Sequence, residues 1–111
     1  MALQQIGKFT LHQQGGYVCR TMFTYVDDDG QTVESHQTGN ELLGQTYTTD
    51  PGDLGVPNGS MLWMKIWVMA GYDNQARQGF LYQQGGGSIA EYTCSGTTLA
   101  NHLALDGINN N

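Results

Sequence analysis

The segment of residues 61–70, MLWMKIWVMA, carries the side chains best suited to contact another molecule. In a β-strand, successive side chains point to opposite faces. One face then presents an apolar stripe for the core, formed by Leu62, Met64, Ile66, Val68 and Ala70. The other face carries the set that we call the Trp ribbon, namely Met61, Trp63, Lys65, Trp67 and Met69.

The chemistry of the Trp ribbon favours binding. The indoles of Trp63 and Trp67 would lie about 13 Å apart, at roughly 3.3 Å per residue, with the Lys65 ammonium between them. An indole offers a large contact area and one hydrogen-bond donor, which suits stacking on a sugar, insertion at a lipid interface or docking of a protein. Lys65 can stack on an indole or contact an anionic group of a ligand. We therefore expect the Trp ribbon to bind a glycan or a membrane surface.

A second interpretation buries the same side chains. A central strand can be covered on both faces, with Lys65 extending to the rim. The ribbon can also be buried between copies of the chain, which would then be a self-assembling structural protein and a homo-oligomer. Low charge, abundant Gln and Asn, and the polar residues 109–111 suit such assembly.

The remaining chemically versatile residues form no local catalytic or metal-binding pattern. His12, His36 and His102 are far apart in the sequence, and the chain has no HExxH or CxxC motif. No local pattern therefore predicts a zinc site. The acidic turn at residues 27–30 lacks the EF-hand spacing. The GxSxG, GxGxxG and P-loop motifs are also missing. We expect no enzyme, no metal and no cofactor. A deep pocket with converging His and Asp side chains would instead support a small enzyme with a dispersed site.

The charge balance argues against nucleic acid as a partner. The formal net charge is -6 and the pI is near 4.5. The basic residues stand singly, at Lys8, Arg20, Lys65 and Arg77. Nucleic-acid affinity depends on clustered Lys and Arg, and electrostatic capture by anionic lipid needs a similar cluster.

The N-terminal segment MALQQIGKFT shows no secretory signal pattern, and no apolar run reaches the length of a membrane-spanning helix. We expect a cytoplasmic protein, or one released without a signal peptide. In that setting Cys19 and Cys94 are predicted to be buried free thiols, although a single bridge between distant strands is the alternative.

Strand-like patterns recur about every ten to fifteen residues between Gly, Asp, Asn and Pro. With 111 residues, 39% of them apolar and 13% charged, the chain is expected to be a single domain over residues 1–111. The predicted fold is all-β, an antiparallel, jelly-roll-like β-sandwich of about eight strands, with a small closed barrel as the alternative. The predicted strands are residues 5–12, 17–26, 31–37, 42–49, 61–70, 76–84, 88–95 and 98–105.

Three segments decide how these strands connect. The sequence DDG at residues 28–30 predicts a hairpin, and the proline- and glycine-containing stretch 50–60 predicts a crossing between sheets. Residues 97–105, TTLANHLAL, also fit a short helix, because the Leu and Ala spacing matches both periods. We predict a strand there.

In being small, acidic, Trp-bearing and without an evident leader, the chain resembles cytoplasmically stored defence lectins and β-sandwich cytolysins. This resemblance covers composition and architecture, and it carries over no functional positions. It implies a defence lectin or toxin component. The sequence thus predicts a non-enzymatic module that recognises a glycan or membrane surface through the Trp ribbon.

Overall fold

The computed structural model describes residues 3–110, in which strands are the main secondary structure. One short 3-10 helix, η1 (Pro51–Leu54), lies among these residues. The strands are β1 (Gln5–Ile6), β2 (Lys8–Gln13), β3 (Cys19–Val26), β4 (Thr32–Glu34), β5 (Thr46–Thr49), β6 (Met61–Val68), β7 (Asn74–Gln75), β8 (Phe80–Tyr82), β9 (Ser88–Thr97) and β10 (Ala100–Asn110).

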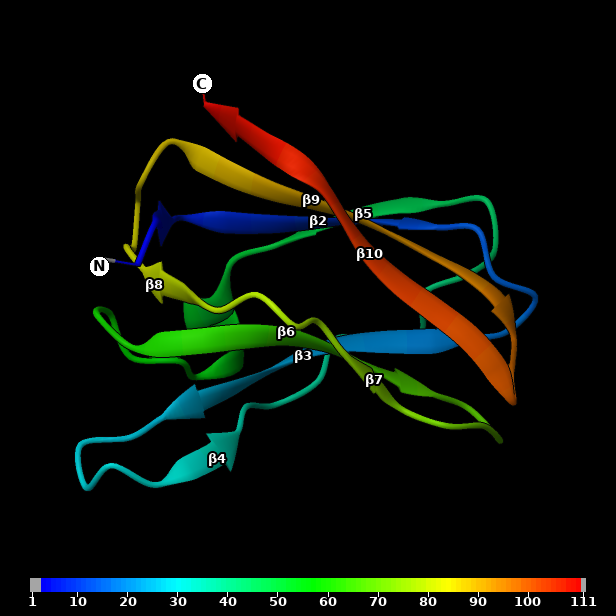
Figure 1. The fold of residues 1–111 in the computed structure, drawn as a ribbon, viewed down its shortest axis with the longest axis horizontal. Coiled ribbons are helices and arrows are strands. Elements are labelled where there is room, and N and C mark those ends of the chain that lie inside the picture. The colour runs from blue at the N-terminus through cyan, green and yellow to red at the C-terminus, as the bar shows by residue number, and fades with distance from the viewer. Residues whose placement is uncertain (1–2, 111) are drawn as a thin grey trace.

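The strands form two sheets that pack face to face (Figure 1). Sheet A has six strands in the order β1-β8-β6-β3-β4, with β7 paired to β6 off this path. Sheet B has four strands in the order β10-β9-β2-β5. The predicted all-β sandwich is therefore confirmed.

Both sheets are mixed and not purely antiparallel. β2 pairs with β9 in parallel, and β1 pairs with β8 in parallel. The chain leaves sheet B after β2, forms β3 and β4 in sheet A, and passes through sheet B once as β5. It then forms β6, β7 and β8 in sheet A and returns to sheet B as β9. A long crossover of this kind permits a parallel neighbour, whereas the short turns between β3 and β4 and between β9 and β10 impose antiparallel pairs.

The C-terminal segment is a strand, as predicted, and the helical alternative is wrong. β10 pairs with β9 along its whole length. A register shift between Leu105 and Gly107 turns the strand locally. Because of this shift, Leu103, Leu105 and Ile108 all pack against the core.

The predicted connections are also present. The turn between β3 and β4 places Gly30 at a φ of 79°, where a side chain would be strained. The stretch of residues 50–60 leads from β5 in sheet B to β6 in sheet A and includes η1. Asp50 caps η1 by accepting a hydrogen bond from the Gly52 amide.

The core centres on aromatic rings from both sheets. The Phe9 ring of β2 lies 4.9 Å from Phe23 of β3 and 6.1 Å from both Phe80 of β8 and Tyr92 of β9, measured between centroids. All four side chains are buried. Phe9 thus joins the two sheets by ring contacts that add to its burial.

The two cysteines lie in different sheets. Cys19 begins β3 in sheet A, and Cys94 lies in β9 of sheet B. Both are fully buried and unbridged, in agreement with the predicted thiols.

We expect the substitution Phe9→Ala to lower the free energy of unfolding by about 3–5 kcal/mol, because it opens a cavity where the sheets meet. Urea denaturation followed by tryptophan fluorescence measures this loss. Phe9→Leu, which keeps most of the volume, serves as the milder control. A loss below about 1 kcal/mol for Phe9→Ala would contradict the central place of this ring.

Candidate functional site

The strand β6 alternates between faces as its sequence predicts. Leu62, Met64, Ile66 and Val68 are buried between the sheets. The strand ends at Val68, and Ala70 lies in the following turn, exposed and at a φ of 57°. Ala70 therefore does not belong to the core stripe, because the chain reverses before reaching it.

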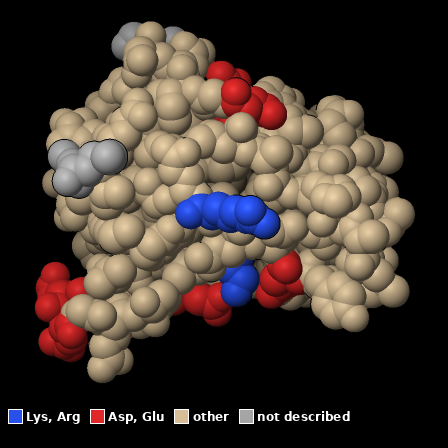
Figure 2. All heavy atoms as spheres, in the orientation of Figure 1, with Lys and Arg blue, Asp and Glu red and all other residues tan. Residues whose placement is uncertain are grey.

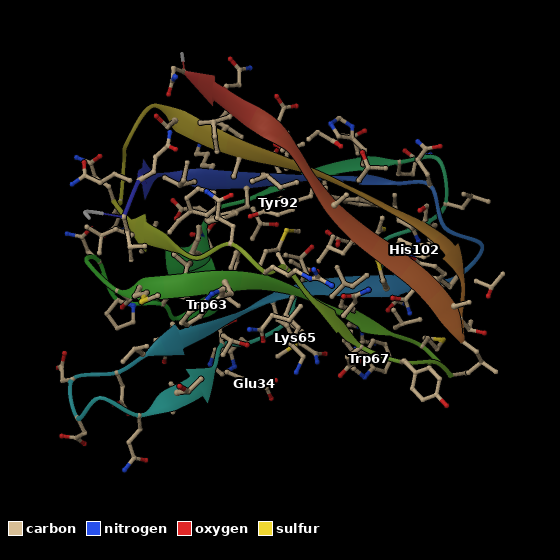
Figure 3. The ribbon with its side chains drawn as sticks, in the orientation of Figure 1. Glu34, Trp63, Lys65, Trp67, Tyr92 and His102 are labelled. Carbon is tan, nitrogen blue, oxygen red and sulfur yellow. The ribbon has the colours of Figure 1, made fainter. Side chains whose placement is uncertain are left out.

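The middle of the Trp ribbon lies on the outer face of sheet A, where Trp63, Lys65 and Trp67 are half-buried (Figure 3). The Lys65 Nζ lies 2.5 Å from Glu34 Oε2 on β4, so this ammonium already has a carboxylate partner within the chain. The Arg20 guanidinium carbon lies 4.8 Å from the centroid of the Trp67 ring. The cation over the indole is thus Arg20 and not Lys65.

The other members of the Trp ribbon lie near its ends. Met61 is half-buried at the start of β6, and Gly79 packs so closely that a Cβ there would lie 2.9 Å from Trp63 Nε1. Met69 is exposed in the turn after β6. The ribbon is therefore outside the core, but its centre is occupied by contacts within the chain. Its role in binding stays a prediction.

A second surface forms at one end of the sandwich, which we call the apolar tip. It gathers most of the exposed large hydrophobic side chains among residues 3–110. Leu43 is 58%, Leu99 65% and Tyr72 67% exposed. They stand in the β4–β5, β9–β10 and β6–β7 connections, respectively. The apolar tip comprises Leu42, Leu43, Met69, Tyr72 and Leu99.

Hydrogen bonds join these connections into one surface. The Tyr72 amide donates to the Thr98 carbonyl at 3.0 Å, and Asn101 Nδ2 donates to the Tyr72 carbonyl at 2.7 Å. Any residue larger than glycine at Gly71 would clash with the Thr98 carbonyl oxygen. The turns that carry Tyr72 and Leu99 are therefore held together by hydrogen bonds and close packing.

The connection between β2 and β3 fixes the other side of the apolar tip. The Gly44 amide donates to the Gln13 carbonyl at 2.7 Å, next to the Leu42–Leu43 pair. The Met69 amide donates to the Val18 carbonyl at 2.9 Å. Gln13 itself is fully buried, and its side chain bonds to Gly15 N at 2.6 Å and to Tyr17 O at 2.5 Å.

The apolar tip carries few charges in its turns. Residues 14–18, 42–45, 69–72 and 96–99 contain no Asp, Glu, Lys or Arg, and the exposed Asp73 directly follows Tyr72. Figure 2 shows no charged atoms at the right-hand end of the visible face, where these turns lie in Figure 1. The acidic turn at residues 27–29 lies at the other end of β3. The three consecutive carboxylates of that turn therefore lie at the end of the sandwich opposite the apolar tip.

A buried carboxyl stands directly behind the apolar tip. Glu41 precedes Leu42, is 2% exposed, and accepts a hydrogen bond from Thr21 Oγ1 at 2.6 Å. Its backbone exchanges hydrogen bonds with Cys19, at 2.7 and 3.2 Å. Burial raises the pKa of the Glu41 carboxyl above its ordinary value, and the hydrogen bond from Thr21 offsets part of that rise.

Sequence reasoning missed most of the apolar tip. Residues 42–49 were expected to form one strand, whereas β5 begins at Thr46 and leaves Leu42 and Leu43 in a turn. Leu99 fitted the inner face of a strand, but it stands at the β9–β10 turn. The usable signal was the pair of adjacent leucines before Gly44, which an amphipathic strand does not explain.

Residues 3–110 offer neither a ready metal site nor a membrane-spanning helix. No group of three or more His, Cys, Asp or Glu side chains there is placed to hold a metal ion. None of its helices has the length and apolar character needed to cross a membrane.

Comparison with known proteins identifies the fold. No protein-family model matches the chain, and no curated protein matches it in sequence. A crystal structure of wild-type pneumolysin aligns with 95% of this chain at a TM-score of 0.52 and 16% identity, covering 23% of that chain. The chain shares its fold with part of pneumolysin.

Two further pneumolysin structures are similar. One, described as the sugar-binding protein pneumolysin, has a TM-score of 0.51 and 15% identity over 93% of this chain and 23% of its own. The membrane-binding domain of pneumolysin has a TM-score of 0.49 and 17% identity over 95% of this chain and 98% of its own. The chain spans less than a quarter of pneumolysin and 22% of listeriolysin O. At these identities the similarity to pneumolysin is one of fold, and no residue role is transferred.

We expect the stability of the chain to fall as the pH rises through the raised pKa of Glu41. The folded state holds the Glu41 proton more tightly than the unfolded state, so the stabilisation is complete below the unfolded pKa and is lost above the folded one. Urea midpoints of the wild type and Glu41→Gln across the acidic and neutral range measure it. The amide has the same shape and carries no charge, so the variant should gain relative stability toward neutral pH. Parallel pH profiles would contradict this assignment.

Proposed function

We propose that this chain is a membrane-binding module, used as a toxin component, that inserts the apolar tip into the lipid interface. The single observation that carries this proposal is the gathering of Leu42, Leu43, Met69, Tyr72 and Leu99 on turns without a basic residue at one end of the sandwich. Contiguous exposed apolar patches on soluble proteins mark interaction sites. The similarity in fold to pneumolysin supports the toxin part of the proposal.

The expected strength of this contact follows from the area involved. Full burial of a Leu, Met or Tyr-sized apolar side chain contributes about 2 kcal/mol, and the members of the apolar tip have between 40% and 67% of their surface available. The sum is about 5 kcal/mol, comparable with one myristoyl chain. A single copy therefore binds reversibly, and stable attachment requires several copies or a second contact.

The charge of the protein indicates which lipids suit it. With a net charge of -6 and no basic residue in the turns of the apolar tip, the contact does not draw on attraction to anionic lipid. Binding should be at least as strong to zwitterionic vesicles as to anionic ones, and added salt should not weaken it. This behaviour would separate insertion of apolar side chains from electrostatic adsorption.

Only one end of the Trp ribbon lies close enough to the apolar tip to contact the membrane in this proposal. Met69 belongs to both surfaces, and Trp67 lies two residues earlier on the same face of β6, about 7 Å away along the strand. The Trp67 indole is thus placed to rest at the level of the lipid headgroups, where aromatic rings are favoured. Trp63 lies farther from the apolar tip and packs on Gly79.

We expect Leu43→Ala and Leu99→Ala each to weaken binding to phosphatidylcholine vesicles about fivefold, because each removes roughly 1 kcal/mol of apolar contact. Vesicle co-sedimentation measures the change, and the double variant should lose about 25-fold. Leu3→Ala is the matched control, since Leu3 is an exposed leucine outside these turns. Equal effects of all three substitutions would overturn the proposal.

We expect Trp67→Ala to weaken vesicle binding several-fold and Trp63→Ala to leave it unchanged, with both variants folded, because neither indole lies in the main core. The same co-sedimentation assay and thermal denaturation measure the two effects. If both variants lose binding, the whole Trp ribbon contacts the ligand. If light scattering across a dilution series shows a persistent oligomer whose formation needs Trp63 and Trp67, the ribbon is instead an assembly interface.

A further inference from the structure

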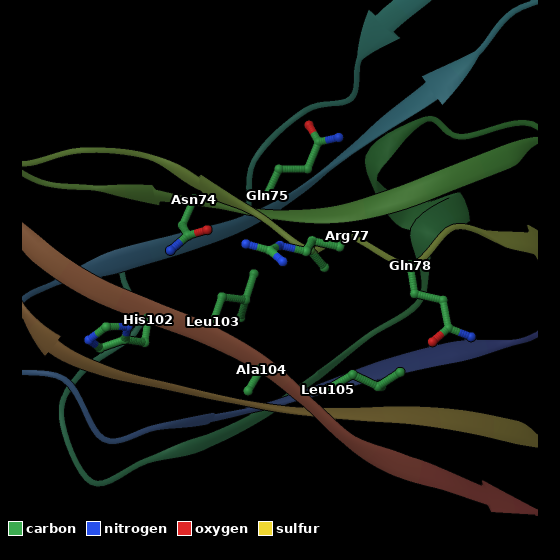
Figure 4. A pocket seen from close by; sticks show the side chains of 9 residues that line it. Asn74, Gln75, Arg77, Gln78, His102, Leu103, Ala104 and Leu105 are labelled. Carbon is green, nitrogen blue, oxygen red and sulfur yellow. The ribbon is translucent and has the colours of Figure 1, made fainter.

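A groove runs along one side of the sandwich, between β7 of sheet A and β10 of sheet B (Figure 4). Asn74 Nδ2 donates to Asn101 Oδ1 at 2.9 Å and bridges the two strands near the apolar tip. Beyond this bridge the strands separate. The resulting groove, with a volume of about 490 Å³, is lined by residues 74–78 and 102–105. It lies outside both surfaces described above.

The groove holds a cation without a carboxylate partner. Arg77 is exposed, and it makes no ion pair within residues 3–110. In contrast, Lys65 pairs with Glu34, and Arg20 donates to Asn40. No acidic residue lines the groove. In Figure 4 the Arg77 guanidinium reaches over the groove toward Leu103. A chain with a net charge of -6 thus leaves a positive group free here.

The rest of the groove is suited to a sugar. Gln78 and His102 supply hydrogen-bond donors and acceptors at the groove, and Leu103 and Leu105 supply apolar contacts. The Gln75 side chain points away from the groove and accepts a hydrogen bond from Thr24 Oγ1 at 2.8 Å. β10 ends sheet B, so the backbone groups on its outer edge have no strand partner. Hydroxyl groups pair with such amides and edge groups, while the C–H face of a pyranose packs on aliphatic side chains. A guanidinium binds a carboxylate through two parallel hydrogen bonds.

We propose that this groove binds a carboxylated sugar at the end of a glycan, with Arg77 holding the carboxylate. The choice of a glycan over a lipid phosphate rests on the lining of the groove, where the aliphatic Leu103 and Leu105 lie beside the polar Gln78 and His102. A phosphate would use only the cation, whereas a sugar ring uses the apolar and the polar groups as well.

The test uses soluble sugars and no membrane, so it is independent of the apolar tip. Isothermal titration compares 3′-sialyllactose with its methyl ester, and cellobiouronic acid with cellobiose, because the members of each pair differ at the carboxyl group. The acidic member of at least one pair should bind about tenfold more tightly than its neutral partner. The sialic acid and uronic acid arms identify which source of carboxylate fits. Equal affinities within both pairs, or no binding of any sugar, would overturn the proposal.

Substitutions of two basic residues, Arg77 and Lys8, complete the test. Arg77→Gln should lose the preference for the acidic sugar, about a tenfold change, and Arg77→Lys should keep only part of it, because an ammonium cannot form the paired hydrogen bonds. Lys8→Gln, which removes another exposed cation, is the matched control and should change nothing. Arg77→Gln should also bind phosphatidylcholine vesicles as the wild type does. Weaker vesicle binding by this variant would show that Arg77 contacts lipid phosphate, and would overturn the glycan assignment.

Discussion

The buried amide of Gln13 is the contact on which the arrangement of the apolar tip depends. The chain turns from sheet B into sheet A directly after this residue, so several backbone groups lose their strand partners inside the protein. The Gln13 side chain accepts from Gly15 N and donates to Tyr17 O, while its backbone bonds to the segment that carries Leu42 and Leu43. An apolar residue of similar size would leave these groups unsatisfied, which is unfavourable in a buried site.

In this arrangement the residues that stabilise the core are separate from the residues that the turns expose to solvent. The core requires rigid packing of Phe9 against both sheets, and the turns at the end of the strands are then free to carry side chains that the core does not need. Glu41 lies at the boundary between the rigid core and the exposed turns, because it is buried and the next residue, Leu42, is exposed. The acidic turn at residues 27–29 places three consecutive carboxylates at the other end of β3, away from the exposed leucines.

The sequence was informative where one strand determines the outcome. The alternation in β6 predicts its buried face, because every second side chain from Leu62 to Val68 must enter the same core. It was less informative where distant segments meet. The parallel pairing of β2 with β9 depends on a crossover that no local pattern encodes. The groove at Arg77 depends on where two sheet edges diverge, and the sequence shows only an isolated arginine. The Trp ribbon could be predicted in part. The alternation of side chains along β6 places the indoles on the outer face, but it does not show that Arg20 packs on Trp67 and that Glu34 pairs with Lys65.

The position of the two cysteines has a practical consequence. Cys19 and Cys94 belong to opposite sheets and are both sealed from solvent. An alkylating reagent such as iodoacetamide can reach these thiols only when the layers part, since reaction needs an accessible thiolate. The rate of their modification therefore reports how often the sandwich opens, and it does so without any engineered label.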